Sequence, residues 1–186
     1  MQKIKTIGWD MDGVLFNFAK RYAEMYTNTH PEEPVTETDI IQNWDVSKTT
    51  KYGDKLWKLP HFFSGMEAYS EMAELFRWCY CHYECYVITT APHYVLAEKT
   101  NLMKKICPEF SDWDIFFCNR KDMVSVDILI DDAPHNAKNC KENCIVVDMP
   151  YNKGIECVAR VKNAGDLYAW IRAHVEPRDF FKEEVI

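Results

Sequence analysis

The 186-residue sequence lacks any apolar run that approaches the ~18 residues needed to span a lipid bilayer, so no membrane partner is expected. Its first stretch, MQKIKTIGWD, lacks the long apolar region of a secretory signal, and the sequence therefore predicts a cytoplasmic protein. Internal repeats and low-complexity segments are absent too. The composition, 47% hydrophobic and 27% charged, is that of a globular chain with one sizeable core.

The sequence also lacks an excess of positive charge, because its 29 aspartate and glutamate residues outnumber its 22 lysine and arginine residues. The formal net charge of -7 argues against polymeric nucleic acid as a partner, since binding to a phosphate backbone needs clustered Lys and Arg. An acidic protein that binds a small phosphate compound needs a cation at that site. The sequence leaves the oligomeric state open, and a homodimer is one of the states it allows.

Eight cysteines are present, and in a reducing compartment they stay thiols. The segment CYCHYEC holds Cys79, Cys81, His82 and Cys85, whose ligand types suit zinc. A single segment of this kind lacks the second ligand pair of usual structural zinc sites. Buried thiols are therefore the favoured interpretation, and a zinc-binding scaffold with a vestigial acidic site is kept as an alternative function.

Short β-rich runs of nearly continuous apolar character recur along the chain, as in strands buried on both faces of a parallel sheet. The expected strands are KIKTIGWD (3–10), CYVITT (85–90), DIFFCN (114–119), VDILIDD (126–132) and CIVVDM (144–149). Apolar residues at three- and four-residue spacing predict helices over 67–80, 93–107 and 164–175. The alternation predicts an α/β protein with a doubly wound, Rossmann-like parallel sheet.

Residues 16–66 interrupt this alternation after the first strand. They contain the helix-like segment FNFAKRYAEMY, the turn HPEEP and the aromatic segments NWDV and LPHFF. A connection of about fifty residues exceeds an ordinary crossover. The sequence therefore predicts a small helical cap over residues 16–66, with residues 1–15 and 67–186 forming the α/β catalytic core.

Polar side chains gather at or just after the predicted strand ends, where ligands bind in such sheets. Asp10 and Asp12 follow the first strand in the stretch IGWDMDGVLFNF, and two like charges so close together are costly without a cation. The other polar residues placed in this way are Thr89, Thr90, Lys121, Asp131 and Asp132. A strand, a paired acid and a turn together indicate a functional site.

Four of these elements resemble, in order, the four motifs of the haloacid dehalogenase superfamily of phosphotransferases: DMDGVL, the threonine of VITTAP, Lys121 and ILIDD. The strings KDMVSVDILIDD and DMPYN resemble the 5'(3')-deoxyribonucleotidase family in particular, over nearly the whole chain. The resemblance implies a Mg²⁺-dependent phosphatase that hydrolyses deoxyribonucleoside monophosphates through an aspartyl-phosphate. A small sugar or metabolite phosphate is the alternative substrate for the same chemistry.

The resemblance also implies roles for the polar residues. Asp10 matches the nucleophile, and Asp12 matches the acid and base that protonates the departing sugar oxygen. Thr90 donates to a phosphoryl oxygen, and Lys121 supplies positive charge to the nucleophile and the phosphate. For Thr90 the competing interpretation is a hydroxyl that caps the helix starting near His93.

The implied metal ion is Mg²⁺, a hard cation that prefers oxygen ligands. Asp10, the backbone carbonyl of Asp12, and Asp132 match its ligands, while Asp131 matches a residue that holds the lysine or a metal-bound water. Which of the adjacent Asp131 and Asp132 is the direct ligand rests on the resemblance and not on spacing.

Two aromatic residues of the expected cap resemble the family's nucleobase site. Phe18 lies six residues after Asp12, as the family's base-stacking phenylalanine does, and Trp44 in NWDV resembles its cap tryptophan. Packing within the cap is an equally weighted interpretation. The resemblance is incomplete at two positions: mammalian relatives have TSP where this chain has TAP at 90–92, and an arginine where it has Ala133. The resemblance therefore implies the substrate preference less firmly than the chemistry.

Overall fold

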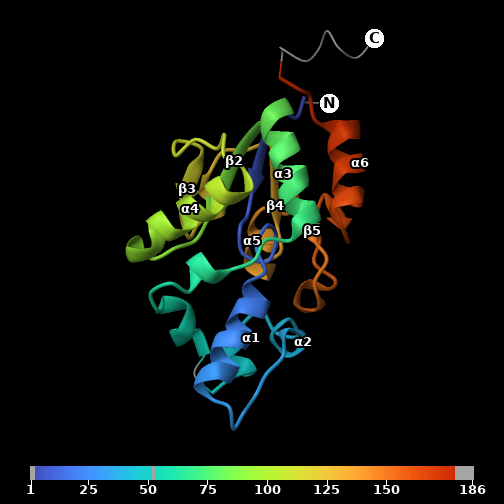
Figure 1. Cartoon of the computed structure of the whole chain (residues 1–186). Coiled ribbons are helices and arrows are strands. Elements are labelled where there is room, and N and C mark those ends of the chain that lie inside the picture. The colour runs from blue at the N-terminus through green and yellow to red at the C-terminus, as the bar shows by residue number, and fades with distance from the viewer. Residues whose placement is uncertain (1–2, 52, 179–186) are drawn as a thin grey trace.

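The computed structural model describes residues 3–51 and 53–178, which form a six-stranded parallel sheet covered by helices (Figure 1). The strands are β1 (Thr6–Trp9), β2 (Glu84–Thr89), β3 (Ile115–Phe117), β4 (Ile128–Asp131), β5 (Cys144–Val147) and β6 (Ala159–Val161). The α-helices are α1 (Phe18–Thr29), α2 (Glu37–Ile40), α3 (Ser70–His82), α4 (Leu96–Ile106), α5 (Pro134–Asn139) and α6 (Ala164–His174). None of the helices in these two ranges has the length and apolar character that crossing a membrane requires.

β1 lies in the interior of the sheet, whose strand order is β3-β2-β1-β4-β5-β6. On one side it pairs with β2, with Trp9 opposite Val87, and on the other with β4, with Trp9 opposite Ile130. The chain runs outward from β1 to β2 and β3 and then returns to β4, so the strand order reverses beside β1. Ligands of such sheets bind at this reversal, beyond the carboxyl ends of the strands.

Successive residues of each strand point to opposite faces of the sheet, and each face has its own apolar cluster. Val87 and Ile130 belong to the larger cluster, to which α3, α4 and α6 contribute. Ile88 and Leu129 belong to a smaller cluster on the other face, with Ala137 of α5. Burial on both faces explains why the strand sequences are apolar without alternation.

The predicted α/β fold class is confirmed, and each of the five expected strands overlaps an observed one. The sequence analysis does not predict β6 or α5. In β6 only Val161 is buried, so this three-residue strand at the edge of the sheet lacks a continuous apolar run. α5 has six residues, too few to show helical periodicity.

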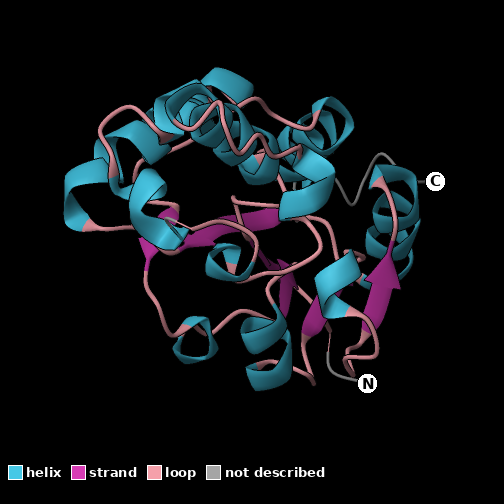
Figure 2. Ribbon diagram, turned by 90° about the horizontal axis from the view of Figure 1, so that it is seen from below, coloured by secondary structure: helices cyan, strands magenta, loops and turns pink. Residues whose placement is uncertain are grey.

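The chain between β1 and α3 forms an insert beyond the carboxyl ends of the strands (Figures 1 and 2). Besides α1 and α2 its described residues form the 3-10 helices η1 (Val46–Lys48), η2 (Gly53–Lys58) and η3 (Phe63–Gly65). Its two ends run side by side, because the N–H of Asn17 donates to the carbonyl of Glu67 (2.8 Å) and that of Tyr69 to the carbonyl of Leu15 (2.9 Å). The division into core and cap at residues 15/16 and 66/67 stays a prediction.

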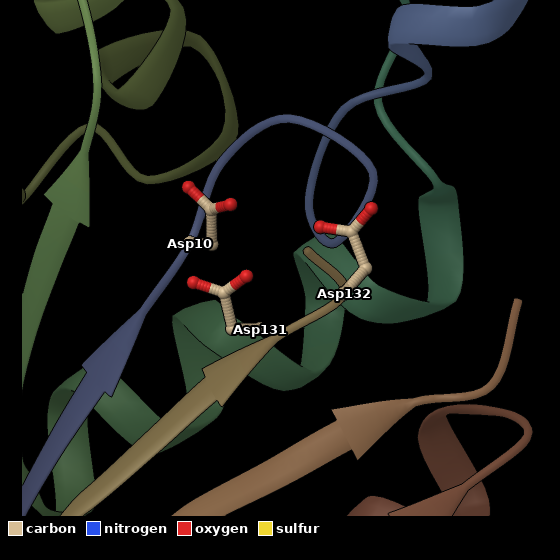
Figure 3. A group of neighbouring side chains, drawn as sticks. All are labelled: Asp10, Asp131 and Asp132. Atoms are coloured by element: carbon tan, nitrogen blue, oxygen red, sulfur yellow. The ribbon is translucent and has the colours of Figure 1, made fainter. Parts of the chain in front are cut away.

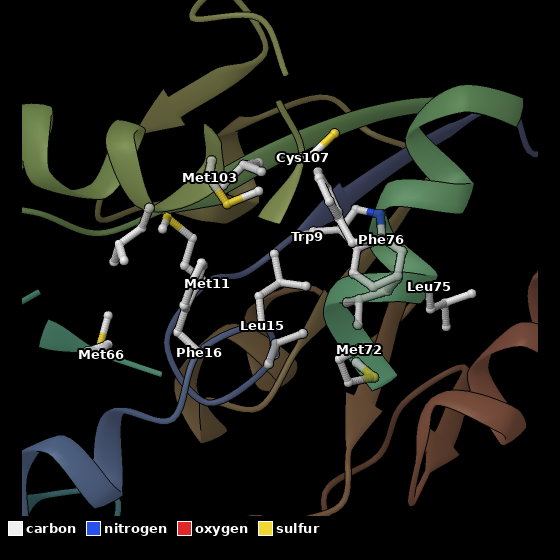
Figure 4. Close-up of a cluster of buried hydrophobic side chains, with 14 of the residues drawn as sticks. Trp9, Met11, Leu15, Phe16, Met66, Met72, Leu75, Phe76, Met103 and Cys107 are labelled. Atoms are coloured by element: carbon white, nitrogen blue, oxygen red, sulfur yellow. The ribbon is translucent and has the colours of Figure 1, made fainter. Parts of the chain in front are cut away.

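Asn17 is the N-cap of α1, and its side chain caps the first turn by accepting from the N–H of Lys20 (2.9 Å). Its buried face is marked by Tyr22 and Tyr26, four residues apart. The cluster that covers one face of the sheet continues without a break into this insert (Figure 4). The insert is therefore seated on the sheet by shared apolar packing.

Phe76 of α3 is at the centre of this packing, with its ring perpendicular to that of Trp9 at a centroid distance of 5.5 Å. We expect Phe76→Ala to lower the free energy of unfolding by about 3–5 kcal/mol, because it removes buried apolar contacts and leaves a cavity. Urea unfolding measures the effect. Trp113→Ala is the control, since Trp113 is 90% exposed and its loss should change stability by less than about 0.5 kcal/mol. Equal losses of unfolding free energy in the two variants would contradict the burial of Phe76 in this apolar cluster.

Candidate active site

Asp10 directly follows β1 and lies beside the end of β4. Its backbone N–H donates to the carbonyl of Ile130 (2.9 Å), and its Oδ1 accepts from the N–H of Met11 (2.7 Å). The side chain is buried. The register between the two strands therefore fixes the Asp10 carboxylate at the strand-order reversal.

The loop after β1 turns sharply at Gly13, whose φ of 84° lies in the left-handed region that favours glycine. A Cβ at this position would lie 2.7 Å from Cγ of Asp132. Glycine therefore lets this loop approach the carboxylate that follows β4.

Three carboxylates meet at this point: Asp10, Asp131 and Asp132 each offer an oxygen, and these oxygens lie within 4.8 Å of one another (Figure 3). Asp131 is fully buried, and both of its oxygens are bound by protein donors. Its Oδ2 accepts from Nζ of Lys121 (2.7 Å) and Nδ2 of Asn136 (3.0 Å), while its Oδ1 accepts from the N–H of Ala133 (2.8 Å).

Asp132 has a different set of partners. Its Oδ2 accepts a hydrogen bond from the hydroxyl of Tyr151, and among the described residues no donor binds its Oδ1. Asn152 fixes the backbone here, because its Nδ2 donates to the carbonyls of Asp132 (2.8 Å) and Val147 (2.8 Å). The loop after β5 therefore holds the end of β4 in place. Sequence reasoning assigned no role to Tyr151 or Asn152, although DMPYN marked the segment.

Lys121 begins the 3-10 helix η5 (Lys121–Met123) and is buried between two carboxylates. Its Nζ lies 2.7 Å from Oδ1 of Asp10 and 2.7 Å from Oδ2 of Asp131. Burial disfavours its charged form, but the two carboxylates outweigh burial and raise the pKa of Lys121 above its usual value. Lys121 is therefore a permanent cation at the site.

One ammonium group does not balance three carboxylates. Burial raises the pKa of Asp132 well above its usual value, and the charges of Asp131 and Asp10 act in the same direction. Burial also raises the pKa of Asp131, although Lys121 opposes the shift. An excess of buried negative charge on oxygen donors is the environment that a hard divalent cation fits.

Asp12 lies in the turn after β1 and pairs with a second lysine, Lys99 of α4, with Nζ 2.6 Å from Oδ2. Asp10 and Asp12, whose closeness in the sequence is costly without a cation, therefore have separate cations. Burial raises the pKa of Asp12, and Lys99 opposes this shift. Sequence reasoning missed Lys99, and its one signal is a place on the same helix face as Leu102 and Met103.

The two threonines after β2 differ in their surroundings. Thr89 is buried and its Oγ1 accepts from Lys99 (2.9 Å), whereas Thr90 is exposed and its Oγ1 donates to the carbonyl of Cys118 (3.0 Å). The interpretation of Thr90 as a helix cap is wrong, because the residues that precede the helical turns are Pro92 and Val95, without a side-chain cap.

A cavity of about 480 Å³ lies between the insert and the strand ends, with Asp10, Asp12, Thr90, Lys121 and Asp132 in its lining. Both aromatic residues singled out from the sequence line it too. Phe18 is half-buried and packs against Phe62 at a centroid distance of 5.2 Å. Trp44 is 50% exposed, and its ring lies 4.7 Å from that of His135 on α5, so the two rings join insert and core.

The segment CYCHYEC does not bring its four candidate ligands together. Cys79 and Cys85 are buried, and burial raises the pKa of Cys85 to about 12, whereas Cys81 is exposed. His82 uses Nδ1 to bond the carbonyl of Trp78 (2.7 Å). Within the described ranges, the group of three ligand atoms that could hold a metal is the aspartate cluster. The buried-thiol interpretation is wrong for Cys81.

Solved structures of haloacid dehalogenase-like hydrolases share this fold. One from Deinococcus radiodurans R1, with bound phosphate and sodium, superposes with a TM-score of 0.61 at 14% identity, covering 91% of this chain and 96% of that chain. A conserved haloacid dehalogenase-like protein from Agrobacterium tumefaciens gives a TM-score of 0.62 at 11% identity, covering 91% and 98%. These likenesses show that the chain has the haloacid dehalogenase-like fold.

The model of the family "5' nucleotidase, deoxy (Pyrimidine), cytosolic type C protein" (NT5C) matches residues 3–176, and the chain belongs to this family. A 5'(3')-deoxyribonucleotidase of Clostridium acetobutylicum is 30% identical over 167 residues, or 85% of this chain and 89% of the relative. One of Bacillus subtilis is 27% identical over 163 residues, or 86% and 94%. The resemblance drawn from the sequence motifs is confirmed.

The excess of negative charge at the three aspartates predicts that a metal ion stabilises the folded protein, and that the size of this effect depends on pH. Because the pKa of folded Asp132 is raised above its usual 3.8, the proton it holds contributes stability that is full below that value and is lost as the pH rises through the raised pKa. A divalent cation that binds this carboxylate competes with the proton, so we expect the rise in melting temperature on adding Mg²⁺ to be larger at about pH 8 than at about pH 5.

Asp132→Asn removes one of the repelling charges. We expect it to raise the melting temperature in chelator at about pH 8 by roughly 2–4 °C, the equivalent of about 1 kcal/mol, and to abolish most of the gain from Mg²⁺. Asp112→Asn, an exposed carboxylate paired with Lys104, is the matched control and should change neither value. A gain from Mg²⁺ that survives Asp132→Asn would contradict the assignment of the cluster.

Proposed function

We propose that this chain hydrolyses deoxyribonucleoside monophosphates with Mg²⁺ and forms an aspartyl-phosphate on Asp10. The observation that carries the proposal is the placement of Asp10. Its carboxylate lies beside the ammonium group of Lys121 and the carboxylate of Asp132, in a cavity that Phe18 and Trp44 also line. Phosphoryl transfer needs a nucleophile, charge neutralisation and a proton donor, and the lining offers all three.

Asp10 acts as the nucleophile. Its Oδ1 is held by the N–H of Met11 and by Lys121, and among the described residues no donor binds Oδ2. In our proposal Oδ2 attacks phosphorus in line with the departing sugar oxygen, so that one P–O bond forms and the other breaks. Lys121 stays charged and stabilises the negative oxygens of the transferring group.

Asp12 acts as acid and then as base. It gives a proton to the departing sugar oxygen and later takes one from the water that hydrolyses the aspartyl-phosphate. Burial, which raises the pKa of Asp12, favours the protonated form that the first step requires. Thr90 contacts a phosphoryl oxygen after its hydroxyl rotates away from the carbonyl of Cys118.

Asp10, Asp132 and the backbone carbonyl of Asp12 are the groups that would hold Mg²⁺. The hydrogen bonds favour Asp132 over Asp131 as the direct ligand, since protein donors occupy both oxygens of Asp131. Asp131 instead positions Lys121. When bound, Mg²⁺ neutralises the repulsion between the attacking carboxylate and the phosphate.

The cavity supports a nucleoside as the leaving group. Its volume of about 480 Å³ is in the range of small-ligand sites, and the aromatic rings of Phe18 and Trp44 offer flat surfaces to a base. The relatives from Clostridium and Bacillus are described as 5'(3')-deoxyribonucleotidases. We also propose a cytoplasmic location, which the unpaired cysteines and the word cytosolic in the family description support.

Phosphate release from a panel of deoxy- and ribonucleoside 5'- and 3'-monophosphates and sugar phosphates tests the proposal. We expect hydrolysis of deoxyribonucleotides that needs Mg²⁺, stops with chelator and falls at least about 1,000-fold in Asp10→Asn, which removes the nucleophile. Asp112→Asn, an exposed carboxylate, is the matched control. Selective hydrolysis of sugar phosphates would keep the chemistry and overturn the nucleotide substrate.

The base site is tested with Phe18→Ala and Trp44→Ala. Loss of stacking worth about 1–3 kcal/mol should lower kcat/KM for deoxyribonucleotides by roughly 5- to 150-fold. Deoxyribose 5-phosphate, which has the same phosphate and no base, should be hydrolysed by both variants as by the parent. Trp113→Ala controls for loss of an exposed aromatic. Unchanged nucleotide turnover in both variants would show that these rings only pack within the insert.

A further inference from the structure

Lys99 is the buried charge that the proposed mechanism does not use. Its side chain is 0% exposed, which is rare for lysine. Its three ammonium hydrogens have three acceptors: Oδ2 of Asp12 at 2.6 Å, Oγ1 of Thr89 at 2.9 Å and the carbonyl of Thr90 at 2.9 Å. The ammonium group is therefore fully committed to these partners and does not face the substrate.

The two oxygens of the Asp12 carboxylate have different surroundings. Oδ2 is bound by Lys99, whereas Oδ1 is buried and has no hydrogen-bond partner among the described residues. Asp12 also lines the cavity that holds Asp10. A carboxyl group anchored by one oxygen in this way presents the other to a reacting group.

Three segments of the chain enclose the Lys99 ammonium group. Its Nζ lies 4.6 Å from the ring centroid of Phe63 on the insert. The preceding residue, Glu98, accepts from the backbone N–H groups of His61 (3.0 Å) and Ser64 (3.2 Å), which ties α4 to the same part of the insert. Contacts from the insert and from the end of β2 therefore hold the side chain of Lys99, which projects from α4, in one conformation.

We propose that Lys99 is a positioning residue that anchors Asp12 by Oδ2 so that Oδ1 meets the oxygen of the departing alcohol. This inference rests on the proposed function. As the P–O bond to the alcohol breaks, its electron pair goes to the alcohol oxygen, and the proton on Oδ1 of Asp12 moves to that oxygen. In the second step Oδ1 takes a proton from water while the water oxygen attacks phosphorus. The P–O bond to Asp10 then breaks, its electron pair returns to the Asp10 carboxylate, and phosphate is released. An unanchored carboxyl group would rotate out of this line.

The test compares the first turnover of two substrates in Lys99→Met by rapid quench. A nucleoside leaves as an alkoxide and needs a proton, whereas p-nitrophenolate leaves without one. We expect release of nucleoside from a deoxyribonucleoside 5'-monophosphate to slow by about 100-fold, and release of p-nitrophenolate from p-nitrophenyl phosphate to stay within about threefold. Later turnovers slow for both, since the second step also uses Asp12, so p-nitrophenolate release should show a burst.

Lys104→Met is the matched control, because Lys104 lies on the same helix and its Nζ pairs with Asp112 (2.8 Å) at the surface. It should leave both first turnovers unchanged. If thermal melting shows that Lys99→Met does not fold, Lys99→Arg, which keeps the charge but changes the donor geometry, is judged by the same two first turnovers.

A selective loss of the nucleoside first turnover supports the inference. Equal slowing of both substrates, or no slowing of either, overturns it, because a residue needed only for folding does not distinguish leaving groups. The proposed function fails in a separate way: the unaltered protein would then release no phosphate from the deoxyribonucleoside 5'-monophosphate with Mg²⁺.

Discussion

The site depends on one constraint, which is that carboxylates at the ends of two neighbouring strands are held where water cannot screen them. Two unit charges 4 Å apart interact by about 4 kcal/mol at an effective dielectric constant of about 20, and a folded domain has only about 5–15 kcal/mol of net stability. Each carboxylate must therefore have a cation, a set of donors or a raised pKa. All three solutions occur here, with Lys121 beside Asp10, N–H donors around Asp131, and a raised pKa for Asp132.

The cations come from one side of the strand-order reversal, whereas the carboxylates come from both sides. Asp10 and Asp132 follow β1 and β4, whereas Lys99 and Lys121 come from the segments that follow β2 and β3. Charge balance therefore joins the two halves of the sheet at the place where ligands bind. The two lysines differ in access: Lys121 lines the cavity, while Lys99 lies behind Asp12. Lys121 is placed to neutralise a charged substrate, whereas Lys99 is placed to orient Asp12.

The sequence predicted those features of the fold and the site that short-range sequence patterns determine. Apolar runs marked the strands, and carboxylates directly after them marked Asp10 and Asp132, because the ends of parallel strands share one edge. Partners that reach the site from a distance left no such mark. Lys99 lies on a helix among other lysines, and its burial follows from the packing of α4 against the insert. Tyr151 reaches Asp132 through a loop whose path a local pattern does not encode.

The insert and the chemistry are not independent, because the insert contacts the core at two places beside the cavity, in addition to its paired ends and its apolar packing. On one side Glu98 holds the backbone of the insert, and Phe63 is buried against the ammonium group of Lys99. On the other side the contact is lighter, since Trp44 meets His135 and keeps half of its surface exposed. Movement at the first place would expose buried apolar surface and separate an ion pair. Movement at the second would separate the rings of Trp44 and His135.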